Sequence, residues 1–225
     1  MAIAPLTELE AINQMLAAVG QAPVTSIDTT TDLYRKNSDN SYTQLEIPTN
    51  PDVAMARLTL EEISRECQSE GWSFNREYEW VMSPDKTSKK IKIPANMLQC
   101  DLSSAPKYKS RYGNKQSIRR NGHLYDKTAH SFLWEEDVYT DVLWLFDWED
   151  IPRPVQDYII NKAMAIFSLR VVGDQNLYQS LSQRAMETRA YALEYETQQG
   201  DYTYFGHPAG QDYYNSYQPF QTLYR

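Results

Sequence analysis

The spacing of apolar residues changes twice along this chain of 225 residues. Near both ends, apolar residues recur at steps of three and four, which is the period of an amphipathic helix. Between residues 72 and 150, large apolar residues alternate with polar ones, which is the period of a half-buried strand. The helices before and after the β region each have an apolar face, and they can bury these faces by packing against one another. We therefore predict an α+β fold in which both chain ends supply one discontinuous four-helix bundle around an inserted, mostly antiparallel β domain.

Two helices are expected before residue 72. Thr7 and Glu10 have the spacing of a capping box, and Gly20 suits the end of that first helix. The second helix begins with Asn50 as N-cap and ends at Gly71. The predicted stripes are Leu9, Ile12, Leu16 and Val19, then Val53, Ala56, Leu60, Ile63 and Cys67. The polar residues 28–49 between them are predicted to be an exposed loop with room for one short strand at 42–47, and their length makes them a candidate attachment surface.

Two further helices are expected after residue 150. The first runs from Ile151 to a break at Gly173, and its wide apolar arc predicts burial on more than one side. The second covers about 175–197, with a stripe of Leu177, Leu181, Ala185, Thr188, Ala192 and Tyr195. We therefore place the bundle at residues 1–71 and 151–198, the β-rich domain at 72–150 and a tail at 199–225.

Several short strands are predicted in the β-rich domain. They cover residues 72–82, 89–94 and 97–103, with one or two more within 132–148. Asn121-Gly122 lies between two short apolar runs and is the strongest hairpin signal in the chain.

The tail has six Tyr and two Phe with no helical or strand period. Tyr buries area at a low cost in rotamer entropy, so an extended segment that becomes ordered against a partner is one interpretation. Packing of the tail along its own domain is the other. The candidate partner-binding residues are Tyr202, Tyr204, Phe205, Tyr213, Tyr214, Tyr217, Phe220 and Tyr224.

Composition excludes several classes of function. A net charge of −8 argues against a general grip on nucleic acid, which needs clustered Lys and Arg. The cysteines, Cys67 and Cys100, have no zinc spacing, and Cys67 is predicted to lie in the core. We expect no metal site, no cofactor and no membrane span. The N-terminus has no secretory pattern, so we expect the protein to act in the cytosol or in something assembled there.

An acidic cluster leaves two interpretations open. Glu135, Glu136 and Asp137 follow Trp134, and a glycosidase needs two carboxylates beside aromatic platforms. A carbohydrate-active module that acts on host surface glycans is therefore an alternative. The other interpretation is a solvated or partner-facing surface, which leaves the chain without catalytic residues.

The one basic run, residues 107–120, interleaves Lys and Arg with Tyr108 and Tyr112. Such a pattern can follow a nucleic-acid backbone. It can also pair with the acidic residues 134–150 of a neighbouring copy, because opposite patches on one chain favour self-association in a ring.

Two segments carry a resemblance to a known family. The segments "LTELEAINQMLAAVGQAPV" and "NPDVAMARLTLEEISRECQSEGWSFNREYEW" resemble the tail tubular protein A family of T7-like podoviruses. The resemblance is most specific over residues 6–27 and 50–80, especially 18–23 and 70–75. It continues more loosely through the β region and into residues 151–174. One departure is residues 28–49, because the family has a much shorter link there.

The resemblance implies a structural protein of the bacteriophage virion and no enzyme. It implies a head-to-tail adaptor in the neck, a ring of twelve copies between the portal and the nozzle, which is tail tubular protein B. Tail fibres would attach outside, and DNA would pass through the lumen without specific binding. Candidate ring or nozzle contacts are Tyr78, Trp80, Lys107, Arg111, Arg119, Arg120, Trp134, Glu135 and Glu136.

Overall fold

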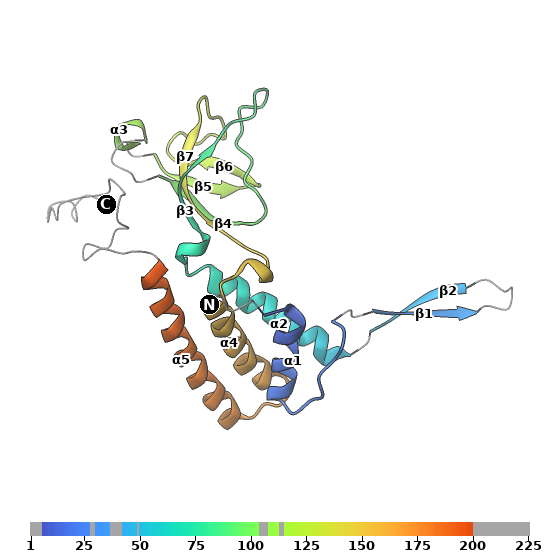
Figure 1. The fold of residues 1–225 in the computed structure, drawn as a ribbon. Coiled ribbons are helices and arrows are strands. Elements are labelled where there is room, and N and C mark those ends of the chain that lie inside the picture. The colour runs from blue at the N-terminus through green and yellow to red at the C-terminus, as the bar shows by residue number, and fades with distance from the viewer. Residues whose placement is uncertain are drawn as a thin grey trace. The chain divides into compact units, whose positions relative to one another are not determined.

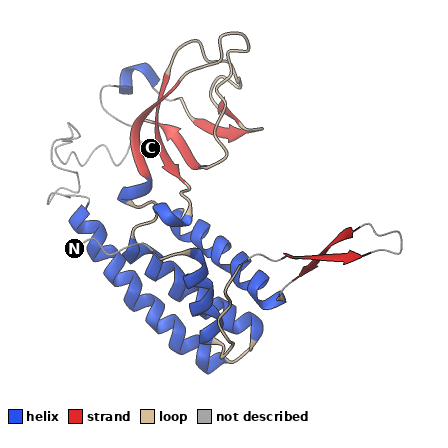
Figure 2. Cartoon of the chain, turned by 45° about the vertical axis from the view of Figure 1, so that its right-hand side comes forward, coloured by secondary structure: helices blue, strands red, loops and turns tan. Residues whose placement is uncertain are grey.

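The computed structural model describes residues 6–27, 30–36, 42–48, 50–103, 108–112 and 115–199. The chain folds into two compact units, and Figure 1 shows the order of their elements. The first unit contains Met1–Glu70 and Phe146–Leu193, and the second contains Gly71–Leu145 and the chain from Glu194. The long helices α1, α2 and α4 belong to the first unit, and a three-stranded antiparallel sheet belongs to the second (Figure 2). The predicted α+β class is confirmed.

Helices α1 (Glu8–Ala18) and α2 (Pro51–Gln68) begin as predicted. Thr7 Oγ1 accepts a hydrogen bond from Glu10 N at 3.2 Å, and the Glu10 carboxylate accepts one from Thr7 N at 2.9 Å. The Asn50 side chain accepts from Asp52 N at 2.9 Å. All five residues of the predicted α2 stripe are buried. Both caps thus satisfy amides that would otherwise lack a partner in the first turn.

Helix α4 (Arg153–Val171) is buried around much of its circumference, as its wide apolar arc predicted. It packs against α1 and α2, which also pack against each other. Helix α5 (Gln175–Gln199) lies beside α4 in Figures 1 and 2. Only Ala185 and Ala192 of its predicted stripe are fully buried, and the half-buried remainder are Leu177, Leu181, Thr188 and Tyr195.

Two buried glutamines join the halves of the first unit. Gln68 Oε1 accepts from Phe146 N at 2.8 Å, and its Nε2 donates to Phe146 O at 3.1 Å. Gln156 Oε1 accepts from Leu6 N at 2.9 Å, while its Nε2 donates to Trp148 O at 2.7 Å. Both amides are fully buried. They bind the returning chain to the N-terminal helices through backbone groups that need partners away from water.

Residues 28–49 were predicted to be a loop, and that prediction is wrong for most of their length. Strands β1 (Thr30–Lys36) and β2 (Tyr42–Pro48) form an antiparallel hairpin whose register runs from Thr30–Pro48 to Lys36–Tyr42. The strand expected at 42–47 is confirmed as β2. The polar composition concealed β1, since Thr30–Lys36 has no apolar alternation beyond Leu33.

The second unit contains the sheet order β3-β7-β4, formed by Arg76–Met82, Val138–Trp144 and Met97–Leu102. A separate hairpin joins β5 (Ser117–Arg120) to β6 (His123–Asp126), which confirms the Asn121-Gly122 turn. Both turn residues have positive φ, 51° and 71°, as a type I′ turn requires. The short helix α3 (Lys109–Tyr112) precedes this hairpin.

Two strand predictions need correction. The strand expected from Trp72 begins at Arg76, because Ser73–Asn75 forms a 3₁₀ turn. The buried Asn75 side chain holds this turn, since its Oδ1 accepts from Trp72 N and its Nδ2 donates to Trp144 O, both at 2.9 Å. Residues 89–94 form only isolated bridges, although Ile91 and Ile93 are buried as a strand pattern predicts.

Candidate functional site

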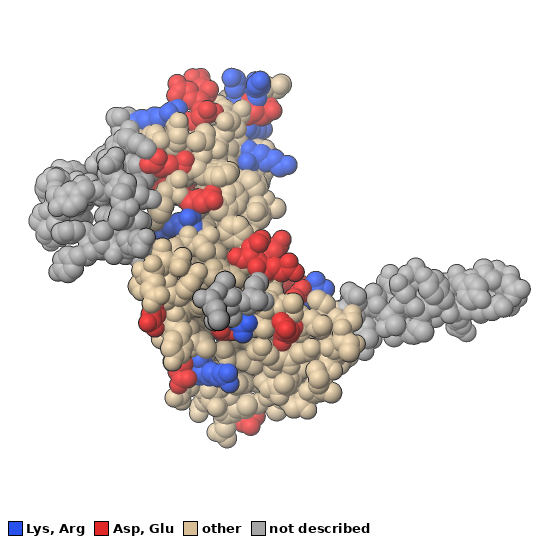
Figure 3. Space-filling model, viewed as in Figure 1, with Lys and Arg blue, Asp and Glu red and all other residues tan. Residues whose placement is uncertain are grey.

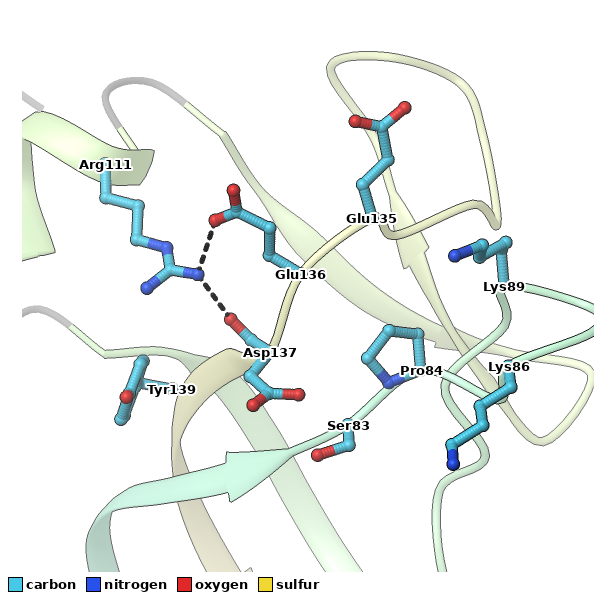
Figure 4. Close-up of a pocket in the computed structure, with 9 residues that line it drawn as sticks. All are labelled: Ser83, Pro84, Lys86, Lys89, Arg111, Glu135, Glu136, Asp137 and Tyr139. Atoms are coloured by element: carbon cyan, nitrogen blue, oxygen red, sulfur yellow. Dashed lines mark hydrogen bonds and ion pairs between the residues drawn. The ribbon is translucent and has the colours of Figure 1, made fainter.

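An open hollow of about 600 Å³ lies on the surface of the second unit (Figure 4). Its lining contains charges of both signs: the basic residues Lys86, Lys89 and Arg111 and the acidic residues 135–137. The remaining lining residues are Ser83, Pro84 and Tyr139. The lining residues as a whole come from the loop after β3, from α3, from the segment directly before β7 and from β7 itself. This hollow includes three of the predicted contact candidates, Arg111, Glu135 and Glu136.

A turn at Asp85 shapes the wall that carries the lysines. Asp85 Oδ1 accepts from Ser88 N at 2.7 Å, Ser88 Oγ at 3.0 Å and Thr87 N at 3.0 Å. These hydrogen bonds, with that from Ser88 N the largest contribution, lower the pKa of the Asp85 carboxyl. Lys89 O in turn accepts from Trp134 N at 2.8 Å. The turn therefore joins the lysine loop to the acidic segment through the backbone.

Arg111 connects the basic run to the acidic segment within one chain. Its Nη2 donates to Glu136 Oε2 and to Asp137 O, each at 2.8 Å. Its guanidinium lies 5.5 Å from the Tyr139 ring, which stacks on Tyr108 at 4.4 Å. The sequence predicts this pairing between neighbouring copies, or a role of the basic run in nucleic-acid binding. The structure shows an Arg111–Glu136 pair within one chain.

Two other basic candidates, Arg119 and Arg120, also contact their own chain. Arg119 Nη1 donates to Met97 O at 3.1 Å, and the Arg120 guanidinium lies 4.1 Å from the Tyr125 ring. Figure 3 shows Lys and Arg interspersed with Asp and Glu over this unit, without a continuous basic patch on the face in view. On this face, the described residues do not form the long cationic groove that a nucleic-acid backbone requires.

Trp134 was expected on a contact surface, and this expectation is wrong. Its side chain is only 6% exposed, and its Nε1 donates to Leu124 O at 3.0 Å. Burial of the ring with its polar atom paired is the usual environment of a core tryptophan. The sequence could not reveal this, because Trp134 directly precedes an acidic run that reads as surface.

Strand β3 exposes three large apolar side chains. Tyr78, Trp80 and Val81 are 40%, 44% and 48% exposed, and β3 is an edge of its sheet. Trp80 meets the Trp144 ring edge-on at a centroid distance of 5.4 Å, which fixes its orientation. Tyr78 and Trp80 are predicted contact candidates. Val81 was missed, because alternation assigns it to the opposite side of the strand from Trp80.

The comparisons with known proteins decide the family. A family model described as tail tubular protein matches residues 35–202, which is most of the chain. The chain is also similar to tail tubular protein A of Klebsiella phage KP34, with 27% identity over 190 residues that cover 84% of this chain and 86% of the relative. The chain belongs to the tail tubular protein family. The suspected resemblance is confirmed.

Tail tubular proteins are structural components of the phage virion and not enzymes, so the predictions of a virion tail protein and of no enzymatic activity are both confirmed. No finding supports the carbohydrate-active alternative. Figure 4 shows the Glu136 carboxylate directed at Arg111, whereas the Glu135 side chain points away from Arg111.

The described residues of this tail tubular protein provide neither a metal site nor a reactive thiol. Within the described ranges, no three His, Cys, Asp or Glu side chains lie close enough together to hold a metal ion. Burial raises the pKa of the Cys67 and Cys100 thiols to about 11, which keeps both protonated near neutral pH. Cys67 is buried in the core, as predicted. No helix in the described part of the chain is long and apolar enough to cross a membrane.

The remaining candidates lie outside the described residues. These are Lys107 and the tail residues Tyr202, Tyr204, Phe205, Tyr213, Tyr214, Tyr217, Phe220 and Tyr224.

Proposed function

We propose that this tail tubular protein is the head-to-tail adaptor of its phage. In this role, twelve copies form a ring between the portal and the nozzle, tail tubular protein B, and tail fibres attach around the outside. The ring is built into the neck of the virion and assembled in the host cytoplasm. The observation that carries the proposal is the family match over residues 35–202, together with the likeness to a protein named tail tubular protein A.

The charge of the chain supports a conduit that does not hold DNA. Its net charge is −8, and a wall of this sign repels phosphate so that a duplex can slide. The basic side chains Arg111, Arg119 and Arg120 contact groups of their own chain. Genomic DNA then passes through the lumen without specific binding.

We assign the contacts of the adaptor to two surfaces. The aromatic residues after Gln199 dock on the portal as an extended segment. The exposed side chains of Tyr78 and Trp80 on the edge strand β3 face the next copy or the nozzle, where their burial would favour association. In the assembled ring, α1, α2, α4 and α5 act as one four-helix bundle.

Purified chain mixed with portal protein and viewed by negative-stain electron microscopy tests the proposal. We expect rings seated on the portal. A variant that ends at Gln199 should stay folded by circular dichroism but lose portal attachment. A matched full-length variant with Tyr178→Ser, a half-buried tyrosine on α5, should retain attachment. The absence of rings with wild-type chain would refute the adaptor role, whereas attachment of the truncated chain would move the portal contact to the helices.

A further inference from the structure

The β1–β2 hairpin forms a sheet of its own. Among the strands that the structure describes, β1 and β2 pair only with each other. Each strand therefore has one edge whose backbone N–H and C=O groups pair with no described strand. A two-stranded hairpin is marginally stable at best in water, because it needs a third strand or a packed face. A further strand at either edge would therefore stabilise the hairpin.

The register divides the hairpin into two faces. Seven rungs follow one another without a shift, and residues two apart on a strand share a face. Leu33 is opposite Leu45, and Ile47 lies at the next position on the same face. This face also holds the positions of Thr31, Arg35 and Thr43, whereas the other face holds Thr30, Asp32, Tyr34, Lys36, Tyr42, Gln44, Glu46 and Pro48. One face is thus apolar along its centre.

The hairpin lacks a protection that the same chain gives to another edge strand. Strand β3 has a bulge between Glu77 and Trp80, where Glu79 has φ 57° and donates its backbone N–H to Asp141 Oδ1 at 3.0 Å. Bulges of this kind prevent an edge from pairing with another chain. The hairpin register is unbroken, and its one proline, Pro48, stands at the last rung. Its edges are therefore open to further pairing.

We propose that neighbouring copies of this chain pair their hairpins edge to edge, with β2 of one copy beside β1 of the next. This contact rests on the ring proposed above. Copies related by rotation about an axis along the strands present opposite strand directions at the shared edge. The new pair is then antiparallel, and closure of the ring leaves no open edge.

The charges favour such pairing with a shifted register. Within the hairpin, Asp32 is opposite Glu46, which places like charges directly across from each other. Closure of tilted strands requires a register shift between neighbours. With a shift of about two residues, Glu46 lies level with Tyr34 of the next copy in place of its Asp32. With a shift of about four residues, Glu46 lies level with Lys36 of the next copy. A shifted register thus avoids the Asp32–Glu46 level between copies, while the register within each hairpin stays as it is.

Hydrogen exchange of the full chain, before and after ring assembly, tests the pairing directly. In a lone hairpin, about half of the strand amides point to an open edge and exchange freely. We expect the number of protected amides within residues 30–48 to rise about twofold on assembly. Unchanged protection of these amides in assembled rings would overturn the proposal and leave the adaptor role intact.

Two variants on adjacent rungs provide a matched test. Leu33→Ser with Leu45→Ser removes the centre of the apolar face, and Tyr34→Ser with Gln44→Ser changes the next rung on the other face. We expect the first variant to raise the concentration for half-assembly at least ~10-fold, in proportion to lost apolar burial, and the second to change it less than ~2-fold. Equal assembly of both variants with wild type would refute the proposal. Wild-type chain that forms no ring would refute both this contact and the adaptor role.

Discussion

Replacing Gln68 with leucine should weaken the connection between the two chain segments of the helical unit and lower its stability. Gln68 is fully buried, and its amide accepts from Phe146 N at 2.8 Å and donates to Phe146 O at 3.1 Å. A leucine of similar volume fills the space but neither accepts nor donates. Phe146 N and Phe146 O then each lose the hydrogen bond that Gln68 supplies, and Ser64 Oγ loses the bond that it accepts from Gln68 Nε2 at 3.1 Å.

The expected loss follows from these two groups. A buried polar group without a partner costs about 1–3 kcal/mol. Because Phe146 is half-buried, water reaches part of it, so we expect Gln68→Leu to lower the free energy of unfolding by about 2–4 kcal/mol. For a chain of this size each kcal/mol lowers the Tm by about 2–4 °C, which gives a total of roughly 5–15 °C.

Thermal unfolding followed by circular dichroism at pH 7 measures this loss. Gln14→Leu is the control, because Gln14 is exposed on α1 and should change the Tm by less than about 2 °C. Gln68→Glu keeps an acceptor for Phe146 N but directs a carboxylate at Phe146 O. The folded pKa of the introduced carboxyl should lie above its unfolded value of about 4.3, so the deficit should shrink below about pH 5 and be complete above the raised pKa. A Tm of the Gln68→Leu variant within about 2 °C of wild type, or a deficit of the Gln68→Glu variant that is independent of pH, would refute the reasoning.

Three further outcomes are expected. Gly71 and Gly20 have φ of +81° and +78°. Only at Gly71 would an added Cβ meet Leu143 carbons, at 3.3 Å. Gly71→Ala should therefore lower the free energy of unfolding, measured in urea, by about 1 kcal/mol more than Gly20→Ala does. Burial raises the pKa of both thiols to about 11, so their contribution to stability is present below about pH 9 and is lost between about pH 9 and 11. Over that range, the free energy of unfolding should fall more steeply with pH in wild type than in Cys67→Ala, as alkaline unfolding would show. Glu136→Gln should cost less than about 0.5 kcal/mol by the same unfolding assay, because its ion pair is largely exposed.

Local signals predicted the helices well. The capping box at Thr7 and the Asn50 cap each depend on residues within a few positions, and each appears as predicted. The same holds for the Asn121-Gly122 hairpin, whose turn requires positive φ at both residues. Such features need no knowledge of the rest of the chain. Gly71 has the positive φ that suits the end of a helix, although α2 ends at Gln68, before the predicted residue.

The errors concern features that depend on distant residues. Trp134 is buried because Leu124, ten residues earlier, supplies a carbonyl for its indole N–H. Asn75 ends the turn before β3 because it reaches the backbone of Trp144. Strand β1 exists because β2 pairs with it along seven rungs, although its own sequence is mostly polar. Periodicity along one segment carries no information on these partners.

Several ion pairs among the described residues join different elements of one chain, so these charges are already partnered before copies of the proposed ring meet. Arg170, Lys162 and Arg189 each pair with a glutamate of the segment from Glu62 to Glu70, at 2.8–3.2 Å. Arg111 pairs with Glu136 in the second unit. In the ring proposed above, we therefore expect contacts between copies to depend chiefly on backbone edges and on apolar side chains such as Trp80. Salt screens exposed charges but not main-chain pairing or apolar burial, so assembly should weaken little between about 0.1 and 0.5 M NaCl. Disassembly within that range would show instead that rearranged ion pairs bridge the copies.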